Sequence, residues 1–427
     1  MISGLYKRYI ECNQQISTDS RNIIPGSIFF ALKGENFNGN LFAEDALKKG
    51  AAYAVIDQAE YLNSNTILVP DVLKTLHQLA RYHRTACGFK VFSLTGTNGK
   101  TTSKELIQRV LSKKYITVAT AGNLNNHIGV PLTILKAKQN TEILVVEMGA
   151  NHIGEIKELC EIALPDYGLI TNIGKAHLEG FGGPEGVIKA KSELYSFLKE
   201  NNKTIFVNKE DALLNSLLTE YNKVVPYGSI ETNCYASNNS FDGKLHIELY
   251  LEGDKKWLST QLFGVYNVIN IVAAASVGLF FQVQIDDIIT AIEEFTPQNN
   301  RSQILKTESN LLILDSYNAN PSSMEVAISS LQSMNNPDKL LILGSMKELG
   351  EFSEAEHKKL VEKIIANELN CIFIGDEFKS LENQYPIEVY SDTDKLIHKL
   401  TEVKIKEKLI LIKGSRYNKL ERLIDFL

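Results

Sequence analysis

The sequence predicts an α/β protein of three domains, and three observations lead to this prediction. The chain has 427 residues, which is too long for one ordinary hydrophobic core. Short apolar runs alternate with helical patterns, as expected of buried parallel strands joined by crossover helices. One stretch changes to a period of two and predicts antiparallel hairpins. We therefore expect a small N-terminal α/β domain, a central parallel-sheet domain with an antiparallel β extension, and a doubly wound, Rossmann-like C-terminal domain, with bounds 1–85, 86–299 and 300–427.

The composition is that of an ordinary globular enzyme. Hydrophobic residues make up 44% and charged residues 22% of the chain. The net charge of −6 gives no electrostatic reason to expect nucleic acid or an anionic membrane as a partner. No run of 18 apolar residues occurs, and the five cysteines form no Cys-x-x-Cys pair. We expect a cytoplasmic protein without membrane insertion.

The N-terminal region contains short strand-like pieces and two helical patterns. Residues 27–32, 52–56 and 66–69 are predicted strands, and residues 42–49 and 71–85 are predicted helices.

The central region alternates strand and helix before its pattern changes. Apolar runs at 90–94, 143–147, 168–173 and 204–208 predict parallel strands. From Val224 to Gly264 the period of two, with turn signals at Asp242-Gly243 and Gly253-Asp254, predicts antiparallel hairpins. A long helix is predicted from Asn267 to Phe281.

The C-terminal region repeats the strand–helix alternation. Apolar runs at 311–315, 339–344, 371–375 and 408–413 each precede a helical segment. About 125 residues is a usual size for one such domain.

Residues 94–102, Leu-Thr-Gly-Thr-Asn-Gly-Lys-Thr-Thr, are the strongest functional signal. They lie between a predicted strand and a predicted helix, where backbone N–H groups and the helix N-terminus can bind phosphate. Lys100 is placed to reach the β- and γ-phosphates, and the Thr101 hydroxyl to bind Mg²⁺. The strict P-loop pattern has glycine where this chain has Leu94, so the loop is a variant. We predict a nucleotide-binding site formed by Thr95, Gly96, Thr97, Asn98, Gly99, Lys100, Thr101 and Thr102.

Polar residues that end or follow the central strands are further candidates, because open α/β sheets bind ligands at the carboxyl ends of their strands. Glu147 closes an apolar run and is a candidate metal ligand, the alternative being a solvated carboxylate. His177 follows a strand in a glycine-rich loop and could bind Mg²⁺ or substrate, although a surface histidine is the default. Lys189 and Lys191 lie in a helical stretch, and the residues alone assign neither a role.

Four polar residues farther along the chain suit a nucleotide. Asn267 and Asn270 lie on one face of a helix and suit the edge of adenine, with helix capping by Asn267 equally compatible. Arg301 could reach a phosphate. Asp315 closes an apolar run and could hold a ribose hydroxyl, and Pro321 fits the first turn of the next helix.

One motif points to a different class of protein. Residues 208–211, Asn-Lys-Glu-Asp, match the pattern with which GTPases bind guanine. However, the phosphate loop lacks its first glycine, and no Asp-x-x-Gly switch follows a strand between the two motifs. We interpret this segment as a strand end.

Taken together, five segments resemble the Mur ligases, the ATP-dependent amide-forming enzymes of peptidoglycan precursor synthesis. The segments are TGTNGKTT, VVEMGANHIGEI, TNIGKAHLEGFG, NVIN and LDSYNANPSSM. The segment STDSRNIIPGSIFFALKGENFNG is similar to the family's UDP-sugar-binding domain, so the resemblance spans nearly the whole chain. Within the family, EMGANHIGEI and YNANPSSM look like the members that join D-alanyl-D-alanine to UDP-N-acetylmuramoyl-tripeptide.

The resemblance implies a role for each candidate residue. Lys100, His177, Lys191 and Arg301 would be catalytic, with ATP and two Mg²⁺ ions as cofactors. The metal ligands would be Thr101, Glu147, His177 and Lys191, the last matching a lysine that related ligases carbamylate. Asn267 and Asn270 resemble adenine contacts, Arg301 the γ-phosphate arginine and Asp315 the ribose carboxylate. The substrate contacts implied are Thr18, Ser20, Arg21, Lys33 and Gly34 for the uridine diphosphate and Asn318, Asn320 and Ser322 for the dipeptide.

The resemblance also implies an acyl-phosphate mechanism and a monomer. Three alternatives remain: the family member that adds the third amino acid, folylpolyglutamate synthase, and a non-catalytic nucleotide-binding partner protein. The absence of an Asp-Asn-Pro-Arg motif argues against the first, and residues 18–39 argue against the second. Intact Lys100, Thr101, Glu147 and His177 argue against the third.

Overall fold

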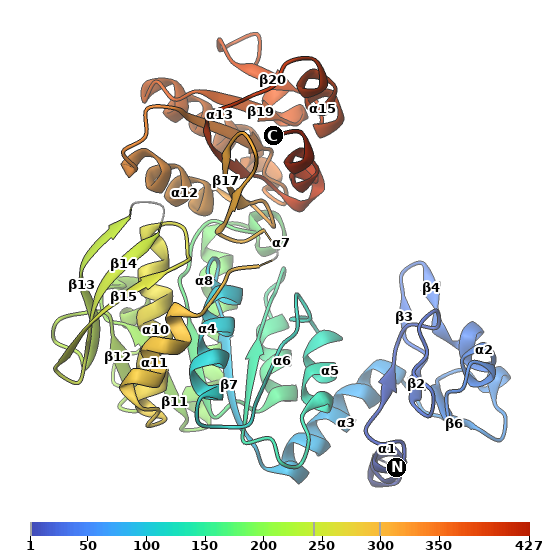
Figure 1. The fold of residues 1–427 in the computed structure, drawn as a ribbon. Helices are drawn as coiled ribbons and strands as arrows, with labels where there is room; N and C mark the ends of the chain where they lie inside the picture. Colours follow the sequence, from blue (N-terminus) through green and yellow to red (C-terminus); the bar gives the residue numbers. More distant parts are fainter. Residues whose placement is uncertain (1, 242–243, 299) are drawn as a thin grey trace. The chain divides into compact units, whose positions relative to one another are not determined.

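The computed structural model describes residues 2–241, 244–298 and 300–427 (Figure 1). The chain forms two compact units. The first contains the chain up to Leu94 together with Tyr115–Ala150 and Gly154–Gly168, and the second contains Thr95–Lys114, Asn151–Ile153 and Leu169–Leu427. Among the described residues, no helix has the length and apolar character needed to cross a membrane.

The N-terminal part of the first unit is a four-stranded parallel sheet with the order β1-β2-β5-β6. The strands are β1 Ile16–Ser17, β2 Ile28–Phe30, β5 Tyr53–Ile56 and β6 Thr66–Leu68. Helix α2, Ala43–Lys48, buries Ala43 and Ala46 against Phe29 and Ala54. The three predicted strands and this helix are confirmed. The patterns missed α1, Ile2–Glu11, and the hairpin of β3, Lys33–Gly34, and β4, Phe37–Asn38.

Helix α3, Val72–Cys87, confirms the second helix predicted in this region. It begins after Asp71, whose side chain accepts a hydrogen bond from the Lys74 backbone N–H, and ends at Gly88 with φ 70°. Both ends therefore have the residue types expected at helix caps. Leu76 and Leu79 are fully buried, so the helix is held by its apolar face.

A six-stranded sheet with the order β12-β11-β10-β7-β9-β8 contains strands of both units. The strands are β7 Lys90–Thr95, β8 Thr117–Ala119, β9 Ile143–Glu147, β10 Tyr167–Ile170, β11 Thr204–Asn208 and β12 Val224–Tyr227. Strands β7 and β8 each pair with β9 in parallel, and β11 pairs with β12 in parallel. The helices along this part of the chain are α4 Lys100–Ser112, α5 Gly129–Lys136, α6 Glu155–Ala163, α7 Leu178–Phe181, α8 Pro184–Glu200 and α9 Ala212–Ser216. The predicted parallel strands are confirmed.

The predicted antiparallel region is correct except at its start. Strand β12 pairs in parallel with β11, so the prediction of hairpins from Val224 is wrong for this strand. Four residues, Val-Val-Pro-Tyr, are too few to show a period, and Pro226 is tolerated because β12 lies at the sheet edge. Strands β13 Cys234–Phe241, β14 Leu245–Leu251 and β15 Asp254–Thr260 are antiparallel as predicted.

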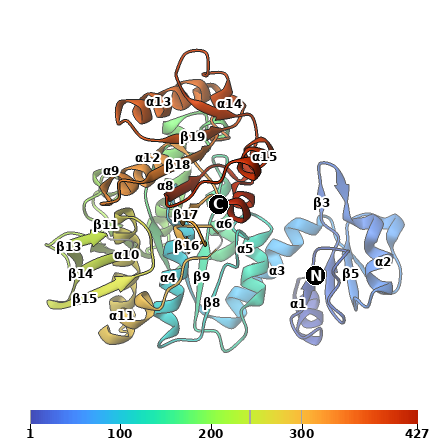
Figure 2. The same cartoon turned by 45° about the horizontal axis from the view of Figure 1, so that its top comes forward.

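The turn between β14 and β15 lies at Glu252-Gly253, one residue before the predicted position. Both residues have positive φ, 52° and 94°, as in the two-residue turns that suit the twist of hairpins. The predicted Asp242-Gly243 turn lies outside the described residues. Strands β13–β15 lie beside α10, Val268–Phe280, and α11, Ile285–Glu293, in both views (Figures 1 and 2).

The last part of the second unit is a six-stranded sheet with the order β16-β17-β21-β18-β19-β20. The strands are β16 Gln303–Lys306, β17 Leu311–Asp315, β18 Lys339–Gly344, β19 Cys371–Ile374, β20 Glu388–Tyr390 and β21 Leu409–Lys413. Edge strand β16 is antiparallel to β17 and was not predicted, whereas the pairs β17–β21, β21–β18, β18–β19 and β19–β20 are parallel. The helices are α12 Pro321–Ser333, α13 Ser353–Ala366, α14 Asp376–Lys379 and α15 Thr393–Glu402.

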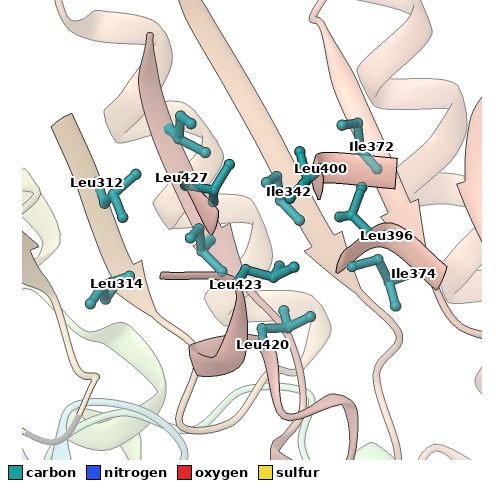
Figure 3. Packing of buried hydrophobic residues seen from close by; sticks show 12 residues of the cluster. Leu312, Leu314, Ile342, Ile372, Ile374, Leu396, Leu400, Leu420, Leu423 and Leu427 are labelled. Carbon is teal, nitrogen blue, oxygen red and sulfur yellow. The ribbon is translucent and has the colours of Figure 1, made fainter. Parts of the chain in front are cut away.

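The core of this sheet explains why its strands were recognisable. Leu312, Leu314, Ile342, Ile372 and Ile374 project from the strands toward one apolar layer (Figure 3). That layer also contains Leu396 and Leu400 of α15 and residues of the C-terminal segment, Leu420, Leu423 and Leu427. Strands covered on both faces read as continuous apolar runs.

Candidate nucleotide and metal site

Residues 95–102 contain the end of β7, a connecting loop at 96–99 and the first turn of α4, so the predicted strand–loop–helix order is confirmed. Its glycines have positive φ, 144° at Gly96 and 78° at Gly99, which side-chain-bearing residues rarely adopt. A Cβ at Gly96 would lie 2.0 Å from Thr171 Oγ1, and one at Gly99 would lie 2.6 Å from Asn270 Oδ1. Both positions therefore require glycine for conformation and for space.

A second loop, residues 171–174, holds the phosphate loop in place. Asn172 accepts hydrogen bonds from the backbone N–H groups of Thr97, at 2.9 Å to its carbonyl oxygen, and of Asn98, at 3.0 Å to Oδ1. Thr171 Oγ1 donates to the Asn98 carbonyl at 2.7 Å. The glycine-rich loop is therefore ordered by side chains that sequence reasoning did not single out. Their position directly after β10 is the signal that could have found them.

Lys100 and Thr101, at the start of α4, differ in their hydrogen-bond partners. Lys100 Nζ donates to the carbonyl oxygens of Gly96 at 2.7 Å and Thr97 at 3.0 Å, so its ammonium lies against the loop. Thr101 is 3% exposed, and its Oγ1 has no hydrogen-bond partner among the described residues. A buried hydroxyl without a partner is costly unless a ligand completes it.

Glu147 ends β9, where its register partner is Leu94, the residue that precedes the phosphate loop. The side chain is 1% exposed. Oε1 accepts a hydrogen bond from Asn125 Nδ2 at 2.8 Å, whereas Oε2 has no partner in the described part of the chain. The alternative of a solvated carboxylate is wrong, because Glu147 is buried with one oxygen open to a ligand.

His177 and Lys191 both contact the ring of Phe181. The His177 ring lies edge-on at 6.2 Å, and Lys191 Nζ lies 5.2 Å from the ring centroid. Lys191 is 2% exposed, so it is not a solvated helix residue. His177 has φ 52°, and its Nδ1 lies 2.6 Å from Glu348 Oε2. The two atoms are at ion-pair distance, and Nδ1 makes no well-formed hydrogen bond with any described residue.

The donor set fits Mg²⁺ better than a transition metal. Within the described ranges, no group of three or more His, Cys, Asp or Glu side chains could hold a metal by itself. Mg²⁺ does not require such a group, because it is bound by one or two carboxylates together with substrate phosphates and water. Thr101 Oγ1 in one unit and Glu147 Oε2 in the other are each a buried oxygen without a hydrogen-bond partner among the described residues, and oxygen is the donor that Mg²⁺ prefers.

Asn267, just before α10, and Asn270 of α10 form a hydrogen-bonded chain that reaches α4. Asn267 Nδ2 donates to the Phe263 carbonyl at 2.7 Å, and its Oδ1 accepts from Asn270 Nδ2 at 2.9 Å. Asn270 Oδ1 accepts from Ser103 Oγ of α4 at 3.1 Å. The Asn267 side chain makes no capping hydrogen bond, so the capping alternative is wrong.

Arg301 and Asp315 have partners that were not predicted. The Arg301 guanidinium lies 3.6 Å from the centroid of the Tyr317 ring, in a cation–π contact. Asp315 Oδ2 forms an ion pair with Lys413 Nζ at 2.5 Å, and Oδ1 accepts from the Ser302 N–H at 3.2 Å. Lys413 ends the apolar run of β21, the same pattern that identified Asp315.

The loop before α12 contacts the phosphate loop. Asn320 caps α12, confirming that Pro321 starts this helix, and its Nδ2 donates to Asn98 Oδ1 at 2.8 Å. Ser322 Oγ accepts from the Lys175 N–H at 3.0 Å. Asn318 Oδ1 accepts from the N–H of the next residue. The structure therefore brings a predicted dipeptide residue, Asn320, to the predicted nucleotide loop.

The candidate uridine-diphosphate residues belong to the N-terminal part of the first unit. Arg21 is 85% exposed and pairs with Asp19 at 2.8 Å; hydrogen bonds from Arg21 lower the pKa of Asp19 to about 2. Lys33 Nζ lies 3.0 Å from the buried carboxylate of Asp57, which was not predicted. Ser20 is buried, Thr18 half-buried and Gly34 exposed. Both predicted cationic side chains, Arg21 and Lys33, are therefore paired with carboxylates in this structure.

Three family models match consecutive parts of the chain. They are "Mur ligase family, catalytic domain" over residues 14–84, "Mur ligase middle domain" over 94–278 and "Mur ligase, glutamate ligase domain" over 300–416. The chain belongs to the Mur ligase family, whose three-domain α/β architecture it has.

Individual relatives and solved structures show which members of the Mur ligase family this chain is similar to. The UDP-N-acetylmuramoyl-tripeptide–D-alanyl-D-alanine ligase of Bacillus subtilis is 34% identical over 423 residues, covering 96% of this chain and 92% of the relative. The structure of MurF from Acinetobacter baumannii has a TM-score of 0.88 at 29% identity, covering 96% and 92% of the two chains. MurF ligase from Thermotoga maritima, solved in complex with ADP, has a TM-score of 0.86 at 27% identity and covers 97% of both chains.

Proposed function

We propose that this protein joins D-alanyl-D-alanine to UDP-N-acetylmuramoyl-tripeptide in peptidoglycan synthesis, with conversion of ATP to ADP and phosphate. The observation that supports this proposal is the match along nearly the whole chain to ligases of that activity, such as the B. subtilis ligase at 34% identity. The enzyme is an ATP-dependent amide ligase of the Mur type. ATP phosphorylates the terminal carboxylate of the tripeptide, which gives an acyl phosphate and ADP. The amine of the dipeptide attacks the acyl carbon, and the tetrahedral intermediate collapses to the amide with loss of inorganic phosphate and a proton.

The nucleotide is assigned to the loop at residues 95–102, and the ADP complex of the T. maritima relative supports this assignment. Lys100 and Arg301 neutralise the β- and γ-phosphates, which lets the anionic carboxylate approach. Asp315 holds the ribose, and Asn267 and Asn270 border the adenine. The hydrogen bonds that hold this loop in place support the role, because a preorganised site loses little conformational entropy when it binds a ligand.

Thr101, Glu147 and His177 are the proposed Mg²⁺ ligands, and two ions are expected. The unpartnered Oγ1 of Thr101 and Oε2 of Glu147 support the first two assignments. Bound Mg²⁺ would neutralise phosphate charge as the γ-phosphate is transferred. Lys191 is proposed to be carbamylated and to contribute to the second ion. Its burial, with 2% of the residue exposed, supports a role inside the protein rather than on a solvated helix face.

The remaining assignments follow from the family. Thr18, Ser20, Arg21, Lys33 and Gly34 bind the uridine diphosphate, and Asn318, Asn320 and Ser322 form the dipeptide site. We propose functional domains at 1–85, 86–299 and 300–427. We further propose that the protein acts in the cytoplasm and as a monomer.

The test is substrate-dependent phosphate release by the full chain. With ATP and Mg²⁺, release should require both UDP-N-acetylmuramoyl-tripeptide and D-alanyl-D-alanine. Dependence on a free amino acid added to the dipeptide precursor would favour the third-residue ligase, and dependence on a folate would favour folylpolyglutamate synthase. ATP turnover indifferent to all of these would contradict the proposal.

Lys191→Ala tests the carbamate. This substitution should abolish measurable activity, because it removes a ligand of the second ion. Acetate or formate in the assay should restore part of the activity if a carbamate oxygen is the native donor. Lys189→Ala, two residues earlier on the same helix, is the matched control and should stay near the parent rate. Undiminished activity of Lys191→Ala would remove this lysine from the site.

A further inference from the structure

The segment after β18 carries a carboxylate that none of the assigned roles uses. Residues 345–352, Ser-Met-Lys-Glu-Leu-Gly-Glu-Phe, are anchored on both sides of Glu348. The Met346 N–H donates to His357 Nε2 at 3.0 Å, and the Met346 and Leu349 side chains are each 1% exposed. Glu348 itself has φ 64° and a side chain that is 53% exposed. A positive φ at glutamate costs conformational energy, which the anchored neighbours must hold.

Glu348 meets His177 through its side chain and its backbone. Oε2 lies 2.6 Å from His177 Nδ1, and the Glu348 carbonyl accepts from the Glu179 N–H at 3.3 Å. Gly350 permits the approach, because a Cβ there would lie 3.1 Å from Glu179 Cβ. His177 also has positive φ, 52°. Two strained residues from distant parts of the sequence therefore face each other.

An ordinary surface ion pair does not account for this arrangement. Exposed pairs contribute little and require no particular backbone conformation. Here the carboxylate reaches one ring nitrogen, which leaves Nε2 as the nitrogen available to a ligand. A histidine that binds a metal through one nitrogen is commonly oriented by a carboxylate at the other, which also raises its basicity as a ligand.

We propose that Glu348 is a positioning residue that orients His177 for the divalent cation. The inference rests on the proposed function, because it takes His177 as a metal ligand. It adds that a residue following β18 completes a metal site whose ligands belong to the nucleotide-binding part of the chain. Strained backbone at both residues is then the cost of bringing the carboxylate to the ring.

The test measures Mn²⁺ binding to the full-length protein with ADP and without the other substrates, so that no turnover occurs. Free Mn²⁺ is counted from its electron paramagnetic resonance signal. Glu348→Gln keeps the shape of the side chain and removes its charge. We expect its dissociation constant for Mn²⁺ to rise about tenfold. Glu351→Gln, an exposed residue of the same segment, should stay within about twofold of the parent.

A double-mutant cycle shows whether Glu348 acts through His177. In a His177→Gln background, Glu348→Gln should weaken Mn²⁺ binding no further. An affinity of Glu348→Gln equal to that of the parent, or equal weakening in both backgrounds, would overturn the inference. If His177→Gln does not fold, the comparison with Glu351→Gln decides alone. The Mn²⁺ measurement does not depend on the acceptor substrates, so failure of the ligase assay with intact coupling would contradict the proposed function and leave the pairing supported.

Discussion

Glu147 and Asp315 arise from the same sequence pattern, four apolar residues closed by an acid, yet the structure gives them opposite surroundings. Glu147 has one carboxylate oxygen bound by Asn125 and the other without a partner among the described residues. Asp315 is paired with Lys413 at 2.5 Å and also accepts a backbone hydrogen bond. One carboxylate is therefore open to a cation, whereas the other already has one.

The difference shows how much a run of apolar residues closed by an acid can reveal about the carboxylate. An acid after a buried run predicts a carboxylate at the ligand-binding edge of a sheet. Whether that carboxylate can take a metal depends on the side chains that reach it from elsewhere in the chain. For Glu147 that residue is an amide from a preceding loop, and for Asp315 it is an ammonium on the neighbouring strand.

The largest effect is expected for Glu147→Gln, which tests whether the two carboxylates differ in function. We expect the turnover number to fall about a thousandfold, since a metal ligand stabilises the transition state by several kcal/mol. The thermal midpoint without nucleotide should not fall, because the substitution removes a buried charge that lacks a full set of partners. Phosphate release and calorimetry on the same preparation give both quantities. Undiminished turnover would contradict the metal assignment.

Asp315→Asn should affect stability more than turnover, the opposite of Glu147→Gln. We expect a large fall in the free energy of unfolding. Lys413 is 2% exposed and would be left as a buried charge without its partner, which costs about 3 kcal/mol. Urea unfolding of the variant and the parent measures the difference. Adding Lys413→Met should recover much of the lost free energy of unfolding, and failure to do so would argue that the pair is not what stabilises this edge.

The smallest expected effect is that of Asn125→Ala, which removes the side chain that orients Glu147. Turnover should fall about tenfold, as for other residues that orient a metal ligand, with a stability loss of about 1 kcal/mol. The control is Asn123→Ala, an exposed residue of the same loop. Equal turnover of the two variants would mean that Glu147 does not need the amide.

The strands that could be predicted are those with continuous apolar runs. β9, β11, β17 and β18 were recognised because each is buried and four to six residues long. The elements that were missed or misassigned are short or lie at an edge, as for β3, β12 and β16. Their pairing depends on the strand they meet rather than on their own pattern.

The candidate site likewise contains residues that the sequence predicted and residues that it did not. Glycine and lysine at fixed spacing between a strand and a helix predicted the phosphate loop, since local backbone geometry dictates those residues. The residues that hold it, Thr171 and Asn172, and the partners Lys413 and Glu348 were not predicted. They are 70 to 170 positions from the groups they contact, and no local pattern connects them.

The sequence by itself determined the strands with continuous apolar runs, the phosphate loop and the family, because these depend on local propensity and on contiguous motifs. The tertiary structure alone decided which polar atoms at the strand ends remain unsatisfied. A carboxylate's neighbours come from distant segments, and in a buried setting those neighbours, rather than the residue type, set the balance between desolvation and pairing. That balance leaves one oxygen of Glu147 without a hydrogen-bond partner among the described residues and gives Asp315 an ion pair.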